Sequence, residues 1–463
     1  MLQPRLPPTS GRGRIRGATA LFWLGVSAVL LQFVFPYVVL QLMGVDPETI
    51  KLHPATVLVV IFGTYALFAG PVPFHQLCRE SPGLVLFVFA IPVLNAYSIY
   101  FTGISGAAQY VETYWSAGLL ALMLAPASPA QKRLLAKILV TLCVINVLIA
   151  LYESFTTTNW FPLVIDPDLK MTDMDIDFRA NAFYNHPLTA SLITSMAIFL
   201  LFAMRMKLVV RAPVLGIFII GLLAFGGRTA LGVTLLACVV MATYVLLAGI
   251  INRNLKLEFV VAIGLAAIIL PVLVGIIVTQ TSIADRIIDT LYFDDSAEAR
   301  MTQWAVFGHL TLNNWLFGIS HDDLNVIKYQ IGLGGKETDI ENFWFLMMLN
   351  LGAIGFAAFL AVFGTFLFHI ARYSRSIYGW LLVIASLVID SGSNSLGVKT
   401  ADLFCEVAFL VAMSGYAGYA PNPNIVPVRT RSQLPGPPRP QGALAIAAPA
   451  KSRELRRLGS RAV

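Results

Sequence analysis

The chain has 463 residues, of which 57% are hydrophobic and only 12% are charged, and its mean hydropathy is +0.76. Soluble proteins carry about 25% charged residues, so this composition excludes a set of ordinary soluble domains and indicates a membrane protein with many spans. The four cysteines all lie in or beside apolar runs, which argues against a disulfide framework and against a structural zinc site.

The start of the chain predicts a membrane anchor that is retained. Residues 1–17 are rich in arginine and are expected to form a cytoplasmic basic arm. The apolar run over residues 18–43 is too long for the hydrophobic part of a signal peptide and has no clear cleavage site. We therefore expect it to be the first transmembrane helix.

Apolar runs along the chain predict an all-α polytopic membrane protein. A bilayer core of about 30 Å needs about 20 apolar residues per helix, and runs of that kind suggest about twelve spans within a transmembrane domain at residues 18–420. Residues 154–185 and 280–341 are expected to form two larger outer loops. The twelve expected helices begin near residues 18, 54, 82, 106, 133, 186, 208, 229, 257, 342, 378 and 401.

The charge distribution predicts the orientation. With the amino terminus inside, most Lys and Arg residues fall on the inner side and most Asp and Glu residues on the outer side. The net charge of +7 then reflects membrane topology rather than nucleic-acid binding, and both termini are expected in the cytoplasm. The Pro-, Ala- and Arg-rich residues 421–463 predict a disordered cytoplasmic tail attracted to anionic lipid.

The second outer loop is expected to contain a helix at the membrane interface. In residues 297–312, Met301, Trp304, Gly308 and Leu312 fall on one helical face, which predicts an interfacial helix. In contrast, the predicted spans contain mainly neutral polar groups at depth, which weakens an ion-coupled transporter. Glu406 in the last span is the main exception, and it either faces a wet cleft or has a function.

Arg228 is the first candidate functional residue, in a very short outer turn between two predicted spans. Two glycines precede it and would allow a sharp turn and close approach of a ligand. An arginine there runs against the charge bias, and its planar guanidinium suits a diphosphate. The alternative is an arginine that reaches lipid headgroups.

Five more candidates lie in or at the ends of the outer loops. Arg300 and Arg286 either bind an anionic substrate or form surface ion pairs with nearby acids. Glu341, beside aromatic residues at the interface, either acts as a base or caps the following helix. Arg179 and the nearby His186, which precedes a proline, either contact one ligand or mark the start of a helix. Two other outer histidines are too isolated to predict a metal site.

Three short motifs resemble the O-antigen ligase and polysaccharide polymerase superfamily over roughly residues 150–370. They are Gly-Gly-Arg228-Thr-Ala-Leu, the segment from Ser296 through Arg300 to Trp304 with Trp315-Leu-Phe-Gly-Ile319, and Glu341-Asn-Phe-Trp-Phe followed by Leu351-Gly-Ala-Ile-Gly355. The stretch from Phe178 to Thr189 is similar to members of exopolysaccharide pathways. Each motif is short, and their shared order on one side of the membrane is the more specific feature.

The resemblance implies a glycosyltransferase of the bacterial cytoplasmic membrane that uses a polyprenyl-diphosphate-linked glycan. Arg228 and Arg300 would hold the diphosphate and Glu341 would deprotonate the acceptor hydroxyl. The expected substrate-binding residues are Arg179, His186, Arg286 and Asn342. The scheme needs no metal and no cofactor. Expected partners are the lipid-linked glycan, membrane lipids and other proteins of polysaccharide assembly, and no nucleic acid.

One position departs from the resemblance. Ligases of the family typically have His-Asn where this chain has Glu341-Asn342. The difference leaves a carboxylate base or a polymerase-type mechanism, with a ligase acting on a lipid or protein acceptor as the alternative. From other classes, a transporter or lipid flippase and a non-catalytic scaffold stay open.

Overall fold

The computed structural model describes residues 11–36, 40, 52–104, 106–161, 178–184, 186–251, 303–332, 340, 342–392, 396 and 400–417. Within these ranges the chain is all-helical and has no strand. The helices are α1 Gly11–Val34, α3 Pro54–Ala69, α4 Phe74–Glu80, α5 Pro82–Thr102, α6 Ala107–Gln109, the π-helix η1 Tyr110–Trp115, α7 Ser116–Leu124, α8 Pro129–Thr156, α9 Pro187–Ala203, α10 Leu208–Phe225, α11 Arg228–Ile251, the 3-10 helix η3 Gln303–His309, α15 Leu312–Phe317, α16 His321–Gln330, α17 Phe343–Ser374, α18 Ile377–Ser391 and α19 Asp402–Ser414.

Several of the long helices begin at a proline. Proline has no N–H to leave unpaired in the first turn, and its φ angle already suits a helix. It opens α3, α5, α8 and α9. The residue before the proline supplies a side-chain cap in three of them: His53, Ser128 and His186 accept backbone N–H groups of the first turn.

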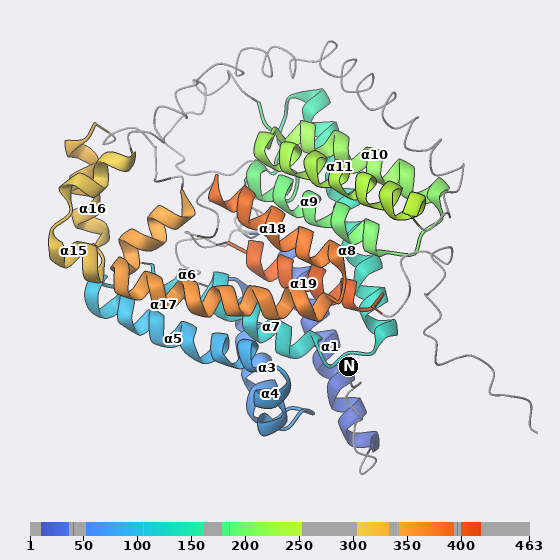
Figure 1. Cartoon of the computed structure of the whole chain (residues 1–463), viewed down its shortest axis with the longest axis horizontal. Coiled ribbons are helices and arrows are strands. Elements are labelled where there is room, and N and C mark those ends of the chain that lie inside the picture. Colours follow the sequence, from blue (N-terminus) through green and yellow to red (C-terminus); the bar gives the residue numbers. More distant parts are fainter. Residues whose placement is uncertain are drawn as a thin grey trace, which may run out of the picture.

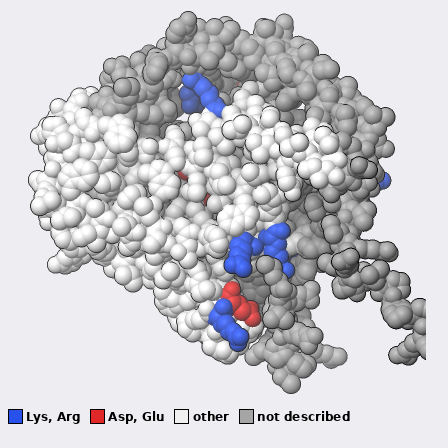
Figure 2. All heavy atoms as spheres, in the orientation of Figure 1, with Lys and Arg blue, Asp and Glu red and all other residues white. Residues whose placement is uncertain are grey.

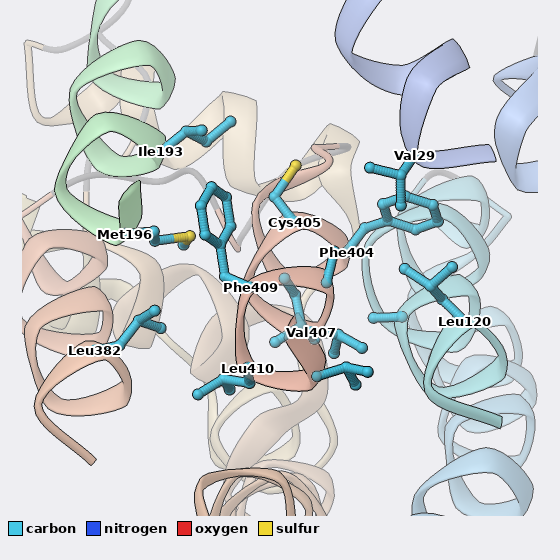
Figure 3. Packing of buried hydrophobic residues seen from close by; sticks show 14 of the residues in the cluster. Val29, Leu120, Ile193, Met196, Leu382, Phe404, Cys405, Val407, Phe409 and Leu410 are labelled. Atoms are coloured by element: carbon cyan, nitrogen blue, oxygen red, sulfur yellow. The ribbon is translucent and has the colours of Figure 1, made fainter. Parts of the chain in front are cut away.

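The last described helix, α19, is the centre of the core. Every residue from Asp402 to Met413 is buried, and a helix that is mostly apolar all round belongs inside a protein. Side chains from α1, α7, α9 and α18 converge on Phe404, Val407 and Phe409 of α19 (Figure 3). Figure 1 shows α9, α10 and α11 on one side of α18 and α19, with α5 and α17 on the other.

The described helices bear out only part of the predicted number of membrane spans. Six described helices are long and apolar enough to cross a bilayer, or seven if α3 and α4, bent by 97°, form one broken span. The 13-residue α19 is only about 20 Å long at 1.5 Å per residue. The expected span near residue 257 lies outside the described residues.

The expected continuous helix over residues 297–312 is not formed in its described part. The 3-10 helix η3 ends at His309, and Thr311 caps a separate helix, α15, by accepting the N–H of Asn314. Residues 297–302 lie outside the described residues. The single apolar face inferred for this segment is therefore broken between His309 and Leu312.

A small second core joins the segment of η3, α15 and α16 to α17. Gly352 has φ +61°, which kinks α17, and a Cβ there would lie well within 3.0 Å of backbone atoms before Ile319. Glycine is thus needed where α15 packs into the kink, and the Ile319 N–H donates to the Leu349 carbonyl at 2.8 Å. The buried residues of this second core are Val306, Ile319, Leu324, Ile327, Ile340 and Leu349.

Charged groups separate toward the two ends of the helices. Lys132 and Arg133 begin α8, and they meet Tyr373 at the end of α17 and Gly415 at the end of α19. On the face seen in Figure 2, the Lys and Arg side chains of the described residues occupy a few patches, one of them beside an Asp/Glu patch, and most of the other described surface is uncharged. The opposite ends of α8, α18 and α19 carry Glu153, Asp390 and Asp402. We call these two regions the basic end and the acidic end.

Candidate functional site

The hairpin between α10 and α11 brings Arg228 to the acidic end. Helix α10 ends at Phe225, Gly226 adopts φ +67° and α11 begins at Arg228, so the turn is as short as the sequence predicts. Arg228 is exposed and engages a partner through an interaction of its own. The position of the side chain at the first turn of a helix adds the positive end of the helix dipole to its charge.

The second glycine of the hairpin serves packing rather than ligand approach. Gly227 is buried, and a Cβ there would lie well within 3.0 Å of the Ser191 side chain in α9. Ser191 in turn donates to the Pro187 carbonyl at 3.0 Å. The tip of the hairpin therefore rests on α9 at Ser191, five residues after His186.

His186 is the N-cap of α9, as the helix-start interpretation predicts. Its Nδ1 accepts the Leu188 N–H at 3.2 Å, which requires a neutral ring with the proton on Nε2. The side chain keeps contact with solvent, yet desolvation by the surrounding protein and the nearby Arg179 both lower the pKa of His186 below its usual 6.5. Arg179 and His186 are thus neighbours. The Nε2–H of His186 is a hydrogen-bond donor that the helix cap does not use.

The loop that carries Arg179 is held by two side chains of α8. Glu153, which is fully buried, accepts the N–H groups of Asn181 and Ala182 at 3.0 and 2.7 Å, and also that of Trp160 at 2.8 Å. Asn146 accepts the Phe183 N–H at 3.0 Å. The sequence indicates that α8 has polar groups at depth, but nothing in its local pattern singles out Glu153.

The start of α17 reaches the same region through α18. Asn342 caps α17 by accepting the Phe345 N–H at 3.1 Å, and its amide donates to the Ser391 carbonyl at 3.2 Å. Trp344 donates to the Ser391 hydroxyl at 2.6 Å. The next residue, Gly392, lies beside Thr229 of the hairpin. A Cβ added to this glycine would be 3.6 Å from the threonine hydroxyl oxygen.

Three predicted site residues, Glu341, Arg300 and Arg286, lie outside the described residues. Of the described residues in the same motifs, Trp304 packs edge-to-face on Phe345, with ring centroids 4.1 Å apart.

Sequence reasoning singled out Glu406 but missed two buried aspartates that lie near it at this end. Asp390 lies at the end of α18, Asp402 begins α19, and both interact electrostatically with Glu406 one turn further on. All three are at most 3% exposed. The available signal was the pair of aspartates flanking the Gly- and Ser-rich connection between the last two predicted spans.

A buried π-helix holds that connection in place. Thr113 of η1 accepts the Thr400 N–H at 3.0 Å, and Gln109 donates to the Leu396 carbonyl at 3.2 Å. Single π turns within helices frequently accompany functional sites. Among the described residues, no three His, Cys, Asp or Glu side chains are grouped so that they could hold a metal ion. All four cysteines are free.

The described candidates thus meet at one end of the helix bundle. Contacts of Gly227 with Ser191, of Thr229 with Gly392 and of Asn342 with Ser391 link the hairpin to the starts of α9 and α17. No protein-family model matches this sequence, and no curated protein matches it either. The functional interpretation therefore rests on the geometry and chemistry of these residues.

Proposed function

We propose that this protein is a membrane glycosyltransferase that polymerises or transfers a polyprenyl-diphosphate-linked oligosaccharide. The observation that carries the proposal is the convergence at the acidic end of the Arg228 hairpin, the Arg179–His186 segment and the start of α17. An arginine beside a neutral histidine, with a second arginine on the adjoining hairpin, suits a diphosphate, because guanidinium groups make bidentate contacts with phosphate oxygens.

The proposed reaction is a displacement at the anomeric carbon. The acceptor hydroxyl oxygen forms the new bond, the bond between sugar and diphosphate breaks, and the diphosphate leaves with the electron pair. Glu341 takes the hydroxyl proton, while Arg228 and Arg300 stabilise the charge that develops on the leaving group.

The remaining candidates bind or position the substrate in this scheme. Arg179, His186 and Arg286 contact the diphosphate or the sugar. Asn342 follows Glu341 in the chain, and its amide is already engaged at both its oxygen and its nitrogen, so its part in this scheme is to position that neighbour. The Asn342 side chain therefore acts on the reaction through the residue before it.

The proposed setting is the bacterial cytoplasmic membrane, with about twelve spans, both termini in the cytoplasm and the acidic end facing outward. Basic residues beside the ends of α8, α17 and α19 support this orientation, because Lys and Arg in short loops stay on the cytoplasmic side. A glycan on a lipid diphosphate already carries its leaving group, so the outer compartment supplies no nucleotide. Other proteins of polysaccharide assembly are proposed partners.

The test is product formation in cells that carry Arg228→Ala or Glu341→Gln at unchanged protein levels. We expect both variants to lose polymer and to accumulate lipid-linked intermediate. Single repeat units on the carrier would identify a polymerase, whereas long chains on the carrier would identify a ligase. Normal product from both variants refutes the proposal.

The buried acids favour a second candidate, an ion-coupled transporter of polysaccharide or lipid. Ionisable groups inside a membrane domain often bind or relay ions, and Asp390, Asp402 and Glu406 lie together. However, Asp390 and Asp402 lie close to the ends of their helices. This position fits the proposed glycosyltransferase site better than an ion pathway through the middle of the membrane. Flux of a lipid-linked glycan across vesicles, lost in Glu406→Gln without any glycosidic bond being formed, would identify the transporter.

A further inference from the structure

The loop over residues 178–184 is attached to the bundle by its backbone. Both Glu153 oxygens are occupied: Oε1 accepts the Trp160 N–H, and Oε2 accepts those of Asn181 and Ala182. Three hydrogen bonds from backbone donors to a buried carboxylate make a strong, charge-assisted anchor. Asn146 adds a further bond to the same loop.

The anchor holds a strained backbone. Ala182 has φ +48°, a left-handed conformation that is strained for a residue with a Cβ. The Ala182 N–H makes the shortest of the Glu153 bonds, at 2.7 Å. Strain of this kind persists only where the surroundings enforce it, and it tends to occur at functional sites.

The anchor also keeps the acid away from the arginine. Glu153 lies at the acidic end beside the loop of Arg179, where an ion pair between the two would neutralise the guanidinium. The carboxylate instead bonds to three backbone N–H groups, and the electrostatic neighbour of Arg179 is His186. Arg179 is half-buried at this position, and no acid among the described residues forms an ion pair with it.

We propose that Glu153 is a positioning residue that fixes the 178–184 loop so that Arg179 contacts the diphosphate of the lipid-linked substrate. The inference rests on the proposed function. Its structural basis is that a glutamine at this position could not replace the acid, because an amide has one accepting oxygen while the loop and Trp160 face both oxygens of Glu153.

The experiment measures binding of a radiolabelled polyprenyl diphosphate to the purified full-length protein, with polyprenyl monophosphate as the comparison ligand. We expect Glu153→Gln and Arg179→Ala each to weaken diphosphate binding about tenfold, as expected for loss of charge-assisted contacts. The double variant should bind no more weakly than either single variant, because Glu153 acts through Arg179. Glu80→Gln, at an exposed acid of α4, is the matched control and should bind normally.

Ala182→Gly provides a rescue. Glycine adopts φ +48° without strain, so adding it to Glu153→Gln should restore several-fold of the lost affinity. If Glu153→Gln does not fold, Asn146→Ala, which removes only the Phe183 bond, should give a smaller loss of the same kind.

The outcomes separate the two proposals. No binding of diphosphate by the wild-type protein would overturn the proposed function. Wild-type binding with normal binding by Glu153→Gln, or additive losses in the double variant with Arg179→Ala, would overturn the role of Glu153 and leave the proposed function intact. If Glu153→Gln does not fold, normal binding by Asn146→Ala would overturn that role in the same way.

Discussion

The two ends of the helix bundle use polar and charged side chains in different ways. At the basic end, Arg133 donates to the Gly415 carbonyl at 3.1 Å, and Lys132 donates to the Tyr373 hydroxyl. At the acidic end, the backbone is held instead by Glu153, Asn146 and the His186 cap.

The difference shows how a helix bundle can leave the charge of an arginine available for a ligand. Where cations close the helix ends, they donate hydrogen bonds to the protein and their role is structural. Where a carboxylate, an amide and a neutral imidazole do that work, an arginine nearby keeps its charge for a ligand. Arg179 is the clearest case, because Glu153 faces its loop yet accepts from backbone N–H groups.

The largest expected effect is a difference in product formation between variants of Arg228, at the acidic end, and Arg133, at the basic end. Arg228→Ala should lower product formation by about 10²–10³, the usual effect of removing one group that stabilises transition-state charge. Arg133→Ala should leave product within about twofold, because its hydrogen bond to Gly415 serves packing at the opposite end. Polymer and lipid-linked intermediate are measured at equal protein levels. Equal losses in the two variants would contradict the comparison.

Two glycines of α17 test how the segment of η3, α15 and α16 is attached. Gly352→Ala should destabilise the protein by about 2–4 kcal/mol, because it strains a positive φ and overpacks backbone before Ile319. Gly364→Ala is the control, since a Cβ there meets nothing within 4 Å. Unfolding of both purified variants in detergent is compared with wild type. An unchanged Gly352→Ala protein would exclude the packing of α15 into the kink.

The hairpin glycine should have a smaller effect. Gly227→Ala places a methyl group against Ser191 and should cost about 1–3 kcal/mol, with a partial loss of product as the hairpin moves away from α9. Gly216→Ala, in the open part of α10, should be neutral or stabilise by up to about 1 kcal/mol. Thermal unfolding and product yield together measure the effect. Tolerance of Gly227→Ala would mean that the hairpin does not depend on Ser191.

The smallest expected effect is a pH dependence at the start of α9. The pKa of His186 is lower in the folded protein than its usual 6.5, so the unfolded chain binds more protons and stability falls as the pH drops below about 6.5. Protonated Nδ1 can no longer accept the Leu188 N–H. His186→Asn caps without titrating, so its melting temperature should fall less between about pH 7.5 and 5.5. An identical fall in both proteins would exclude the cap as the cause.

Local patterns in the sequence determined the helical fold and several helix ends. Apolar runs indicated an all-helical membrane protein, proline after a capping residue marked the start of α9, and two glycines marked the tight turn before Arg228. These features depend on residues close together in the chain, so the sequence contains them directly. The number of spans was harder to predict, because a helix buried in the bundle and a helix that crosses the membrane both have apolar sequences.

Only the tertiary structure decided which distant residues meet. Gly318 and Gly352 appear in separate motifs, yet both are glycine because their backbones touch, and Gly227 is glycine because Ser191 lies against it. The sequence analysis did not single out Glu153, and its backbone partners became visible only with the loop that follows 28 residues later. Apolar runs and helix caps depend on residues that are neighbours in the chain, whereas the partners of a buried carboxylate depend on how the helices pack.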